Sequence, residues 1–188
     1  MNTRTVTRTF VFVALILALS VAGAYARQEH GHVKMTFSGT NVATTINLQA
    51  NTVTDEMHAA GKGSFGQFTF RELHADGTPP QPPDGCTGPF FGVLKGAGVF
   101  RFQDGSLLAV AVKDGSGCIN LVERVSALIV NYQINGGTGR FANPSGELTK
   151  TATQTPVLRN ATNAPALLPI VGRFEGTIFR AEPENDDR

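Results

Sequence analysis

The chain has 188 residues, of which 41% are hydrophobic, and its 16 Lys and Arg residues nearly balance 15 Asp and Glu residues. This length suits one domain with a core of its own. The charge is close to neutral, no basic stripe is present, and the aromatic residues do not alternate with Lys or Arg, so no nucleic-acid partner is expected.

The first 26 residues have the pattern of a cleaved secretory signal peptide. Arg4 and Arg8 form a positive segment, residues 10–22 form an apolar run, and Ala24-Tyr25-Ala26 is a cleavage signal of small residues around a variable one. An uncleaved anchor is the alternative, but the apolar run is shorter than the ~20 residues that span a bilayer. We therefore predict an exported protein, periplasmic or extracellular, that begins at Arg27 and has no membrane span in its mature part.

Beyond the leader, hydrophobic residues alternate with polar ones at the period of two that is typical of half-buried strands. Many short strands with few helices predict a barrel or a sandwich, and glycines inside the strands favour the barrel because they allow its bends. The expected fold is all-β, a single antiparallel barrel of about eight strands over residues 27–181, followed by an acidic, flexible tail over 182–188. The expected strands cover residues 33–37, 42–48, 65–73, 93–102, 107–112, 119–122, 127–134, 147–153 and 173–179.

Turn and helix signals lie among these strands. Asp104-Gly105 and Asp114-Gly115 predict tight hairpins, because Gly adopts positive φ freely and Asp tolerates it. No segment of the mature chain has a convincing amphipathic helical pattern. The best helix candidate covers residues 54–60, about two turns, before Gly61 ends it.

The two cysteines, Cys86 and Cys118, both lie in Gly-rich turn contexts. In an exported chain the default state of such a pair is a disulfide, and closing a loop of about 33 residues stabilises by roughly 3 to 4 kcal/mol in the chain-entropy model. A pair of free buried thiols is the alternative. A metal or redox role is disfavoured because the chain has no Cys-x-x-Cys motif.

A glycine-rich segment, Gly136-Gly137-Thr138-Gly139-Arg140-Phe141, joins an alternating strand to the next one. It predicts a barrel corner in which Gly136, Gly137 and Gly139 allow the turn while Phe141 plugs the barrel end. A dinucleotide-binding interpretation of the glycines fails, because Pro144 and the β-pattern beyond it remove the helix that would hold a pyrophosphate.

This corner resembles the Gly-Gly-Thr-Gly-x-Phe corner of the dirigent and allene oxide cyclase families, and exported bacterial barrels carry similar corners. The resemblance covers residues 90–180. It implies an eight-stranded antiparallel barrel, often trimeric, with an apolar cavity. The chain departs from the dirigent pattern after Ala142, where Asn-Pro-Ser-Gly stands in place of Ala-Arg-Gly. The acidic catalytic residues of those families have no aligned counterpart here, so no catalytic role is carried over.

Glu72, Glu123 and Tyr132 are the candidates for a cavity lining, because each continues an apolar, alternating face of a predicted strand. If these faces point inward, a carboxylate among them has a raised pKa and can act as a general acid or base. In the alternative, both Glu side chains lie in water at strand ends and Tyr132 is an ordinary core residue.

No other motif specifies chemistry. His30 and His32 lie near the new N-terminus while His58 and His74 are isolated, so we expect surface histidines, no metal site and no cofactor. Asn160 begins a glycosylation sequon, which has meaning only in a eukaryotic host. The sequence thus predicts an exported barrel that binds a small apolar ligand or acts as a cofactor-free cyclase or isomerase. The alternative is a non-enzymatic structural or protein-interaction module of the cell envelope.

Overall fold

The computed structural model describes residues 28–79, 81–161 and 164–181. Their contacts form one compact unit over Glu29–Arg180, and a second unit comprises the two ends of the chain, of which only Gln28 and Ala181 are described. The predicted leader over residues 1–26 and the tail over 182–188 therefore lie outside the described residues. Within the described ranges, no helix has the length and hydropathy that crossing a membrane requires.

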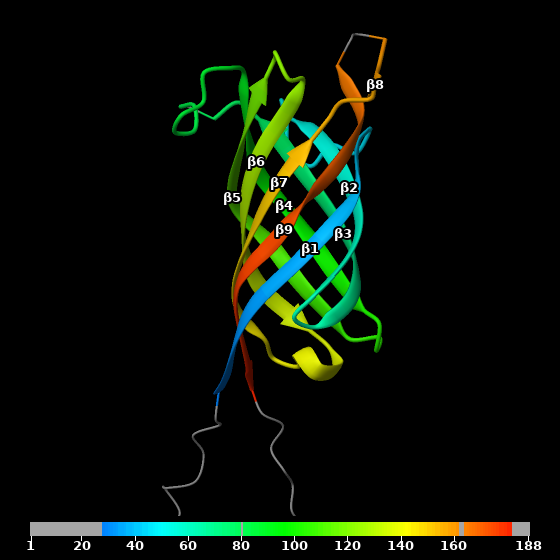
Figure 1. Cartoon of the computed structure of the whole chain (residues 1–188), viewed down its shortest axis with the longest axis vertical. Coiled ribbons are helices and arrows are strands. Elements are labelled where there is room, and N and C mark those ends of the chain that lie inside the picture. Colours follow the sequence, from blue (N-terminus) through cyan, green and yellow to red (C-terminus); the bar gives the residue numbers. More distant parts are fainter. Residues whose placement is uncertain (1–27, 80, 162–163, 182–188) are drawn as a thin grey trace, which may run out of the picture. The chain divides into compact units, whose positions relative to one another are not determined.

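The described chain forms a closed barrel of eight antiparallel strands with one short additional strand (Figure 1). Strands β1 to β7 pair in chain order, β7 pairs with β9, and β9 pairs with β1 to close the ring, while the short β8 adds to β9. The expected all-β barrel is confirmed. Its elements are β1 (Gln28–Thr44), β2 (Val53–Gly63), β3 (Gly66–Gly77), β4 (Phe90–Phe102), β5 (Leu107–Asn120), β6 (Val125–Gly137), the 3₁₀ turn η1 (Gly139–Phe141), β7 (Ser145–Gln154), β8 (Leu158–Arg159) and β9 (Pro165–Ala181).

The helix candidate over residues 54–60 is wrong, because this segment is the centre of β2. Asp55, Met57 and Ala59 are buried while His58 and Ala60 are exposed, which is the period of two that a strand requires. The strand pairs with β1 on one side and β3 on the other, so its backbone hydrogen bonds are satisfied across the sheet. Tertiary pairing thus outweighs the weak local preference for a helix.

One of the two predicted Asp-Gly hairpins is confirmed, and the other is wrong. Gly105 has a φ of 84° in the turn between β4 and β5, and the backbone N–H of Ser106 donates to Oδ1 of Asp104 at 3.0 Å. Asp114 and Gly115 instead lie inside β5 and pair with β6, where the register shifts after Val112. A bulge therefore takes the place of the expected reversal, and the strands expected over 107–112 and 119–122 are one continuous strand. Similarly, residues 42–44 end β1, and no separate strand covers 42–48.

The η1 end of the barrel is filled by aromatic rings. The centroids of Phe70 and Phe100 lie 4.3 Å apart, and those of Phe100 and Phe174 lie 4.9 Å apart. Phe141 is fully buried in η1, with its ring 4.8 Å from that of Phe102 and 5.2 Å from that of Phe65. This packing makes the end of the barrel a solid apolar core.

The glycines of the corner have different roles. Gly139 has a φ of 61°, and a Cβ there would lie 2.6 Å from Oγ of Ser106. A Cβ on Gly137 would lie 2.5 Å from the carbonyl oxygen of Phe141, so that position needs glycine because of close approach. Gly136 has no positive φ, and its nearest neighbour would be 3.9 Å away. The expectation that Gly136 is needed for the turn is therefore wrong, since a side chain fits there.

Cys86 and Cys118 form a disulfide, which confirms the predicted bridge. Their Cα atoms lie 5.6 Å apart at a sequence separation of 32 residues. Cys118 pairs with Phe90 across β4 and β5, so the bond ties the loop that precedes β4 to the end of β5.

We expect the double variant Cys86→Ala/Cys118→Ala to lose about 3 to 4 kcal/mol of unfolding free energy, because the open chain regains loop entropy when it unfolds. Urea unfolding followed by circular dichroism measures this loss. Dithiothreitol should lower the unfolding midpoint of the unmodified protein to that of the variant, and it should leave the midpoint of the variant unchanged. Equal midpoints for the variant and the oxidised protein would contradict a stabilising role of the bridge.

Candidate functional site

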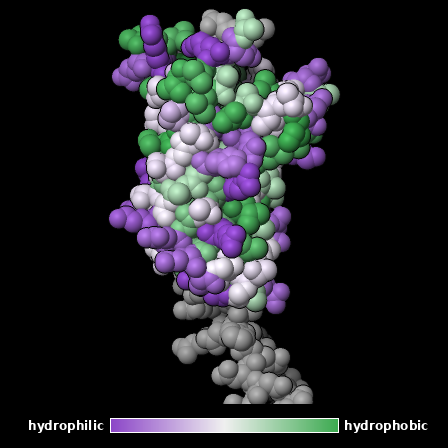
Figure 2. Space-filling model, turned by 90° about the vertical axis from the view of Figure 1, so that its right-hand side faces the viewer, coloured by the Kyte–Doolittle hydropathy of each residue, from purple (hydrophilic) through white to green (hydrophobic). Residues whose placement is uncertain are grey.

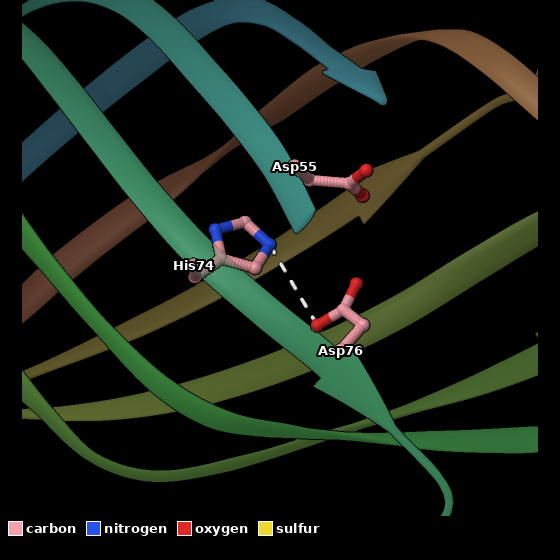
Figure 3. Close-up of side chains that lie close together, drawn as sticks. All are labelled: Asp55, His74 and Asp76. Atoms are coloured by element: carbon pink, nitrogen blue, oxygen red, sulfur yellow. Dashed lines mark ion pairs between the residues drawn. The ribbon is translucent and has the colours of Figure 1, made fainter. Parts of the chain in front are cut away.

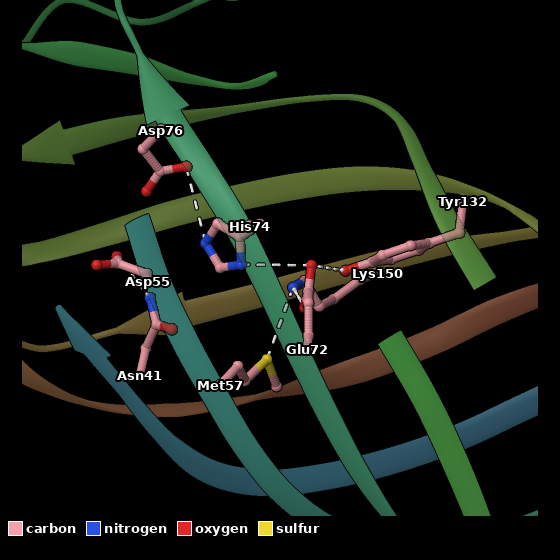
Figure 4. A network of polar contacts seen from close by, with 8 residues as sticks. All are labelled: Asn41, Asp55, Met57, Glu72, His74, Asp76, Tyr132 and Lys150. Atoms are coloured by element: carbon pink, nitrogen blue, oxygen red, sulfur yellow. Dashed lines mark hydrogen bonds and ion pairs between the residues drawn. The ribbon is translucent and has the colours of Figure 1, made fainter. Parts of the chain in front are cut away.

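Polar side chains gather inside the barrel toward the end away from η1 (Figure 4). The alternation of β3 turns Glu72, His74 and Asp76 to the same inward side of the strand as Phe68 and Phe70. All members of this polar cluster are buried except Asp76, which is partly exposed. The cluster comprises Asn41 from β1, Asp55 and Met57 from β2, Glu72, His74 and Asp76 from β3, Tyr132 from β6 and Lys150 from β7.

The carboxylate of Glu72 is the centre of the cluster. Lys150 donates to its Oε2 at 2.6 Å, and the hydroxyl of Tyr132 donates to its Oε1 at 2.9 Å. Nζ of Lys150 also lies 3.6 Å from Sδ of Met57 and 5.4 Å from the centroid of the Tyr132 ring. The network thus joins β3 to the consecutive strands β6 and β7, across sequence separations of 60 and 78 residues. It also pairs one positive charge with one negative charge.

The electrostatics of Glu72 differ from the expectation drawn from the sequence. Burial alone would raise the pKa of Glu72, but Lys150 and His74 outweigh burial and lower this pKa to about 2. The expected raised pKa is therefore wrong, because a buried cation compensates the carboxylate. Burial, together with the adjacent Glu72, raises the pKa of Tyr132 well above its usual range. At neutral pH, Glu72 is a fixed anion and Tyr132 a fixed donor.

A second group of polar residues lies beside Glu72 and contains Asp55, His74 and Asp76 (Figure 3). Nδ1 of His74 is 3.4 Å from Oε1 of Glu72, and its Nε2 is 3.7 Å from Oδ1 of Asp76. Asn41 donates from Nδ2 to Oδ2 of Asp55 at 3.0 Å. Burial raises the pKa of Asp55 and raises that of Asp76 to about 7. Burial would lower the pKa of His74, but the carboxylate of Glu72 raises it overall.

The bulge beside this end of β3 lies in the neighbouring strand. Ala75 pairs with Lys95 and Asp76 with Val93, so Leu94 is the extra residue, in β4, whereas the register between β2 and β3 has no shift. The pleat of β3 therefore continues through this region, and His74 and Asp76 stay on the same side of the sheet. Bulges are frequent beside functional sites.

The structure brings together two of the three candidate residues and separates the third. Glu72 and Tyr132 are hydrogen-bonded in the interior, whereas Glu123 is exposed in the turn between β5 and β6. That turn forms because Oδ1 of Asn120 accepts the backbone N–H groups of Val122 and Glu123 and ends β5. The expectation that Glu123 lines a cavity is wrong, because the alternating face stops before it.

The expectation of surface histidines holds for some positions and fails for His74. His58 is exposed on the outer face of β2, with Nε2 2.6 Å from Oε1 of Glu56, and His32 is exposed on β1. The side chain of His74 is only 4% exposed, because it shares the inward face of β3 with Glu72.

Open grooves lie on the outer face of the barrel over β1 to β4. One of about 620 Å³ is lined in part by Ala60, Lys62, Thr69 and Arg101, which the strand alternation turns outward. A neighbouring groove of about 580 Å³ shares Ala60 and Thr69 and extends to Arg71. Figure 2 views the barrel from the side and shows apolar and polar side chains interspersed over that face. This surface is distinct from the polar cluster in the interior.

No protein-family model and no curated protein sequence matches this chain. Among solved structures it is similar to a dirigent protein described as a pterocarpan synthase, with a TM-score of 0.44 and 13% identity over 86% of this chain and 94% of that one. At this identity and score we transfer no activity and no residue role. The eight-stranded antiparallel barrel, which the dirigent and allene oxide cyclase resemblance implied, is established by the strand pairing of the chain itself.

Sequence reasoning missed most of the site, although one signal was present. The alternating pattern that begins at Phe68 continues past Glu72 to His74 and Asp76, and following it further would have included both. Lys150 occupies an inward position between Leu148 and Ala152 on β7, where a lysine ordinarily signals a solvated strand edge. Its pairing with Glu72 spans 78 residues and has no local signature.

Proposed function

We propose that the polar end of the barrel binds a small, largely apolar molecule that carries one polar group. In this proposal the protein is exported, to the periplasm or the cell exterior, and acts as a ligand-binding protein or as a cofactor-free isomerase or cyclase. The observation that carries the proposal is the fully buried network of Glu72, Lys150 and Tyr132 beside an aromatic core.

Stability alone does not account for this network. The η1 end of the barrel shows that this sequence can fill the interior with phenylalanine, and buried ion pairs are often no more stabilising than apolar residues of similar volume. Perturbed ionisable groups that converge in an interior are typical of functional sites. The presence of a buried lysine and a buried glutamate therefore favours a role in recognition or catalysis.

The chemistry of the network indicates which ligand would suit it. Lys150 and Tyr132 both donate toward one point, so they can hold and polarise a carbonyl, hydroxyl or ether oxygen that replaces part of the Glu72 contact. The rings of Phe70 and Phe174, with centroids each 6.3 Å from that of Tyr132, pack beside the network and would have to move apart to give the rest of the molecule an apolar surface. In an isomerase or cyclase, the same donors would stabilise negative charge that develops on the oxygen.

The test combines native mass spectrometry of the purified full chain with titration of the fluorescent probe 8-anilinonaphthalene-1-sulfonate, which has an apolar aromatic body and one charged sulfonate group. We expect a co-purified small molecule in the unmodified protein. Tyr132→Phe removes only a hydroxyl, and this variant should bind the probe about tenfold more weakly, as expected for a lost hydrogen bond to a charged group. Glu123→Gln changes an exposed glutamate and is the matched control, which should bind the probe as the unmodified protein does.

Two outcomes would contradict this proposal: no co-purified molecule together with no probe binding, or probe affinities that are equal in Tyr132→Phe and the unmodified protein. Circular dichroism of each variant at the same temperature shows whether the fold is retained. Because Tyr132→Phe keeps the ring and its packing, a loss of folding is not expected to obscure the result.

A second candidate, a protein-interaction module, is favoured by a different observation, the grooves on the outer face over β1 to β4. Homo-oligomerisation, which the family resemblance implies as a trimer, belongs to this candidate. Ala60 lines both grooves, so Ala60→Arg should shift the sedimentation coefficient of the protein if this face associates with another copy, while probe binding stays unchanged. An unaltered sedimentation profile would remove this face as the interface between copies.

A further inference from the structure

The end of β3 and the start of β2 place three metal-ligating side chains on one inward face. His74 and Asp76 are two residues apart, so the pleat turns both to the same side of the sheet. Asp55 is the direct cross-strand partner of His74 in the β2–β3 register, and such partners have Cβ atoms about 5 Å apart. One donor atom from each residue lies within 4.8 Å of those of the other two.

Unsatisfied polar atoms concentrate at the same place. Four buried side-chain oxygen or nitrogen atoms in the described part of the chain lack a hydrogen-bond partner, and three of them are Oδ1 of Asn41, Nδ1 of His74 and Oδ1 of Asp76. His74 is 3% exposed, its Nδ1 lies beside Glu72, and its Nε2 faces the unpaired Oδ1 of Asp76 across 3.7 Å (Figure 3). Asn41 is also 3% exposed, and its Nδ2, not its unpaired Oδ1, points at the carboxylate of Asp55 (Figure 4). Buried polar atoms ordinarily have partners, so the unpaired Oδ1 of Asp76 opposite Nε2 of His74 indicates a missing ligand.

The charges around these residues also favour a bound cation. The nearest buried cation, Lys150, forms an ion pair with Glu72, with Nζ 2.6 Å from Oε2. Within the described ranges, neither Asp55 nor Asp76 forms an ion pair with a lysine or arginine. Two carboxylates and an imidazole therefore share a poorly solvated site, and His74 is the one basic side chain that forms an ion pair with either carboxylate in the described ranges. A divalent cation would balance the two carboxylates and give the unpaired Oδ1 of Asp76 a partner.

We propose that Asp55, His74 and Asp76 bind a divalent transition-metal cation of the Zn²⁺ type. An imidazole nitrogen with two carboxylate oxygens suits Zn²⁺ better than Mg²⁺ or Ca²⁺, which prefer oxygen ligands alone. Three protein ligands leave a coordination position for water or for a ligand oxygen, and the partial exposure of Asp76 gives that position a route to solvent.

The surroundings of His74 match those of a metal-ligating histidine. Its Nδ1 faces Oε1 of Glu72 at 3.4 Å while Nε2 faces the carboxylates, and a carboxylate behind the distal nitrogen commonly orients such a ligand. Lys150 and Tyr132 hold Glu72 in place through their hydrogen bonds. Ligands about 2.1 Å from a tetrahedral zinc ion lie about 3.4 Å apart, so binding requires the donor atoms, which now lie within 4.8 Å of one another, to close by up to about 1.4 Å.

The inference does not depend on the organic ligand proposed above, and calorimetric titration of the full chain with ZnCl₂, after metal removal with EDTA, tests it separately. We expect one Zn²⁺ per chain. Asp55→Asn and Asp76→Asn should each weaken binding by on the order of 100-fold, at least as much as loss of an outer-shell partner costs. Asp84→Asn, in the exposed loop before β4, removes the same charge and is the matched control, which should bind Zn²⁺ as the unmodified protein does.

A second readout identifies the donor atom. On Zn²⁺ addition, the ¹⁵N resonance of Nε2 in His74 should move to the range of a metal-bound imidazole, whereas Mg²⁺ at the same concentration should leave it unchanged. Absence of stoichiometric Zn²⁺ binding would overturn the inference. So would Zn²⁺ binding that persists in Asp76→Asn and disappears in His32→Ala, because the ion would then sit on the N-terminal histidines. Asp55→Asn and Asp76→Asn each remove a buried charge, so both should fold without the metal, and circular dichroism checks this.

Discussion

Lys150→Met is expected to lower the free energy of unfolding by about 3 to 5 kcal/mol. The substitution keeps the length and most of the volume of the side chain but leaves the carboxylate of Glu72 buried without its cation, and breaking one partner of a buried pair has this order of cost. Urea unfolding at pH 7 measures the loss. Lys113→Met breaks an exposed pair with Glu147 at 2.7 Å and is the matched control, whose midpoint should barely move.

The double variant Glu72→Gln/Lys150→Met separates the effect of the unpaired charge from an effect of packing. Replacing both partners removes the stranded carboxylate, so the double variant should recover most of the stability that Lys150→Met loses. If the two losses simply added, Glu72 and Lys150 would not be coupled and the network described here would be wrong.

The pH dependence of Lys150→Met has a defined sign. In the unmodified protein the pKa of Glu72 is lowered to about 2, so its contribution to stability is present above the unfolded value of 4.5 and is lost as the pH falls toward 2. Without the ammonium group, burial should instead raise this pKa, and protonation should relieve the variant. The difference in unfolding free energy between the two proteins should therefore begin to shrink above pH 4.5, as the pH falls through the raised pKa of Glu72 in the variant, and should shrink further toward pH 2. A constant difference would contradict the electrostatic cause.

Phe141→Ala is expected to lower the free energy of unfolding by about 3 to 5 kcal/mol, as is usual for a buried phenylalanine. The ring of Phe141 is fully buried at the corner and packs against Phe65 and Phe102, so its loss leaves a cavity that these rings cannot fill without moving. Chemical unfolding measures the loss. Probe binding at the polar end should survive at temperatures where the variant is folded, because the two ends of the barrel do not share these contacts.

Two glycines of the same corner allow a comparison, in which a variant of Gly139 is the test and a variant of Gly136 is its control. Gly139→Val should also destabilise the fold, because a β-branched residue resists a φ of 61° and its Cβ would approach Oγ of Ser106. Gly136→Ala should leave the midpoint unchanged or raise it slightly, since the site is open and alanine has less freedom in the unfolded chain. A similar loss for both variants would mean that the corner tolerates no side chain at all, contrary to the geometry described here.

The fold class, the disulfide and most of the corner could be predicted from the sequence. Alternation of period two requires only that each strand has a buried and an exposed face, and this condition is local. The pairing of Cys86 with Cys118 follows because the chain offers no other partner. The special backbone of Gly139 and the burial of Phe141 could be predicted because short-range sterics restrict which residues fit a tight corner.

The course of β2 and β5 and the positions where the charges meet depend on tertiary contacts. Residues 54–60 become a strand because β1 and β3 pair with them on both sides. Asp114 remains inside β5 because it pairs with β6 after the bulge. Lys150 lies on Glu72 because closing the barrel brings β7 across from β3, and no local pattern encodes that approach. The pKa of Glu72 is therefore lowered where burial alone would have raised it, since electrostatics in an interior depends on which groups the fold brings within a few ångströms.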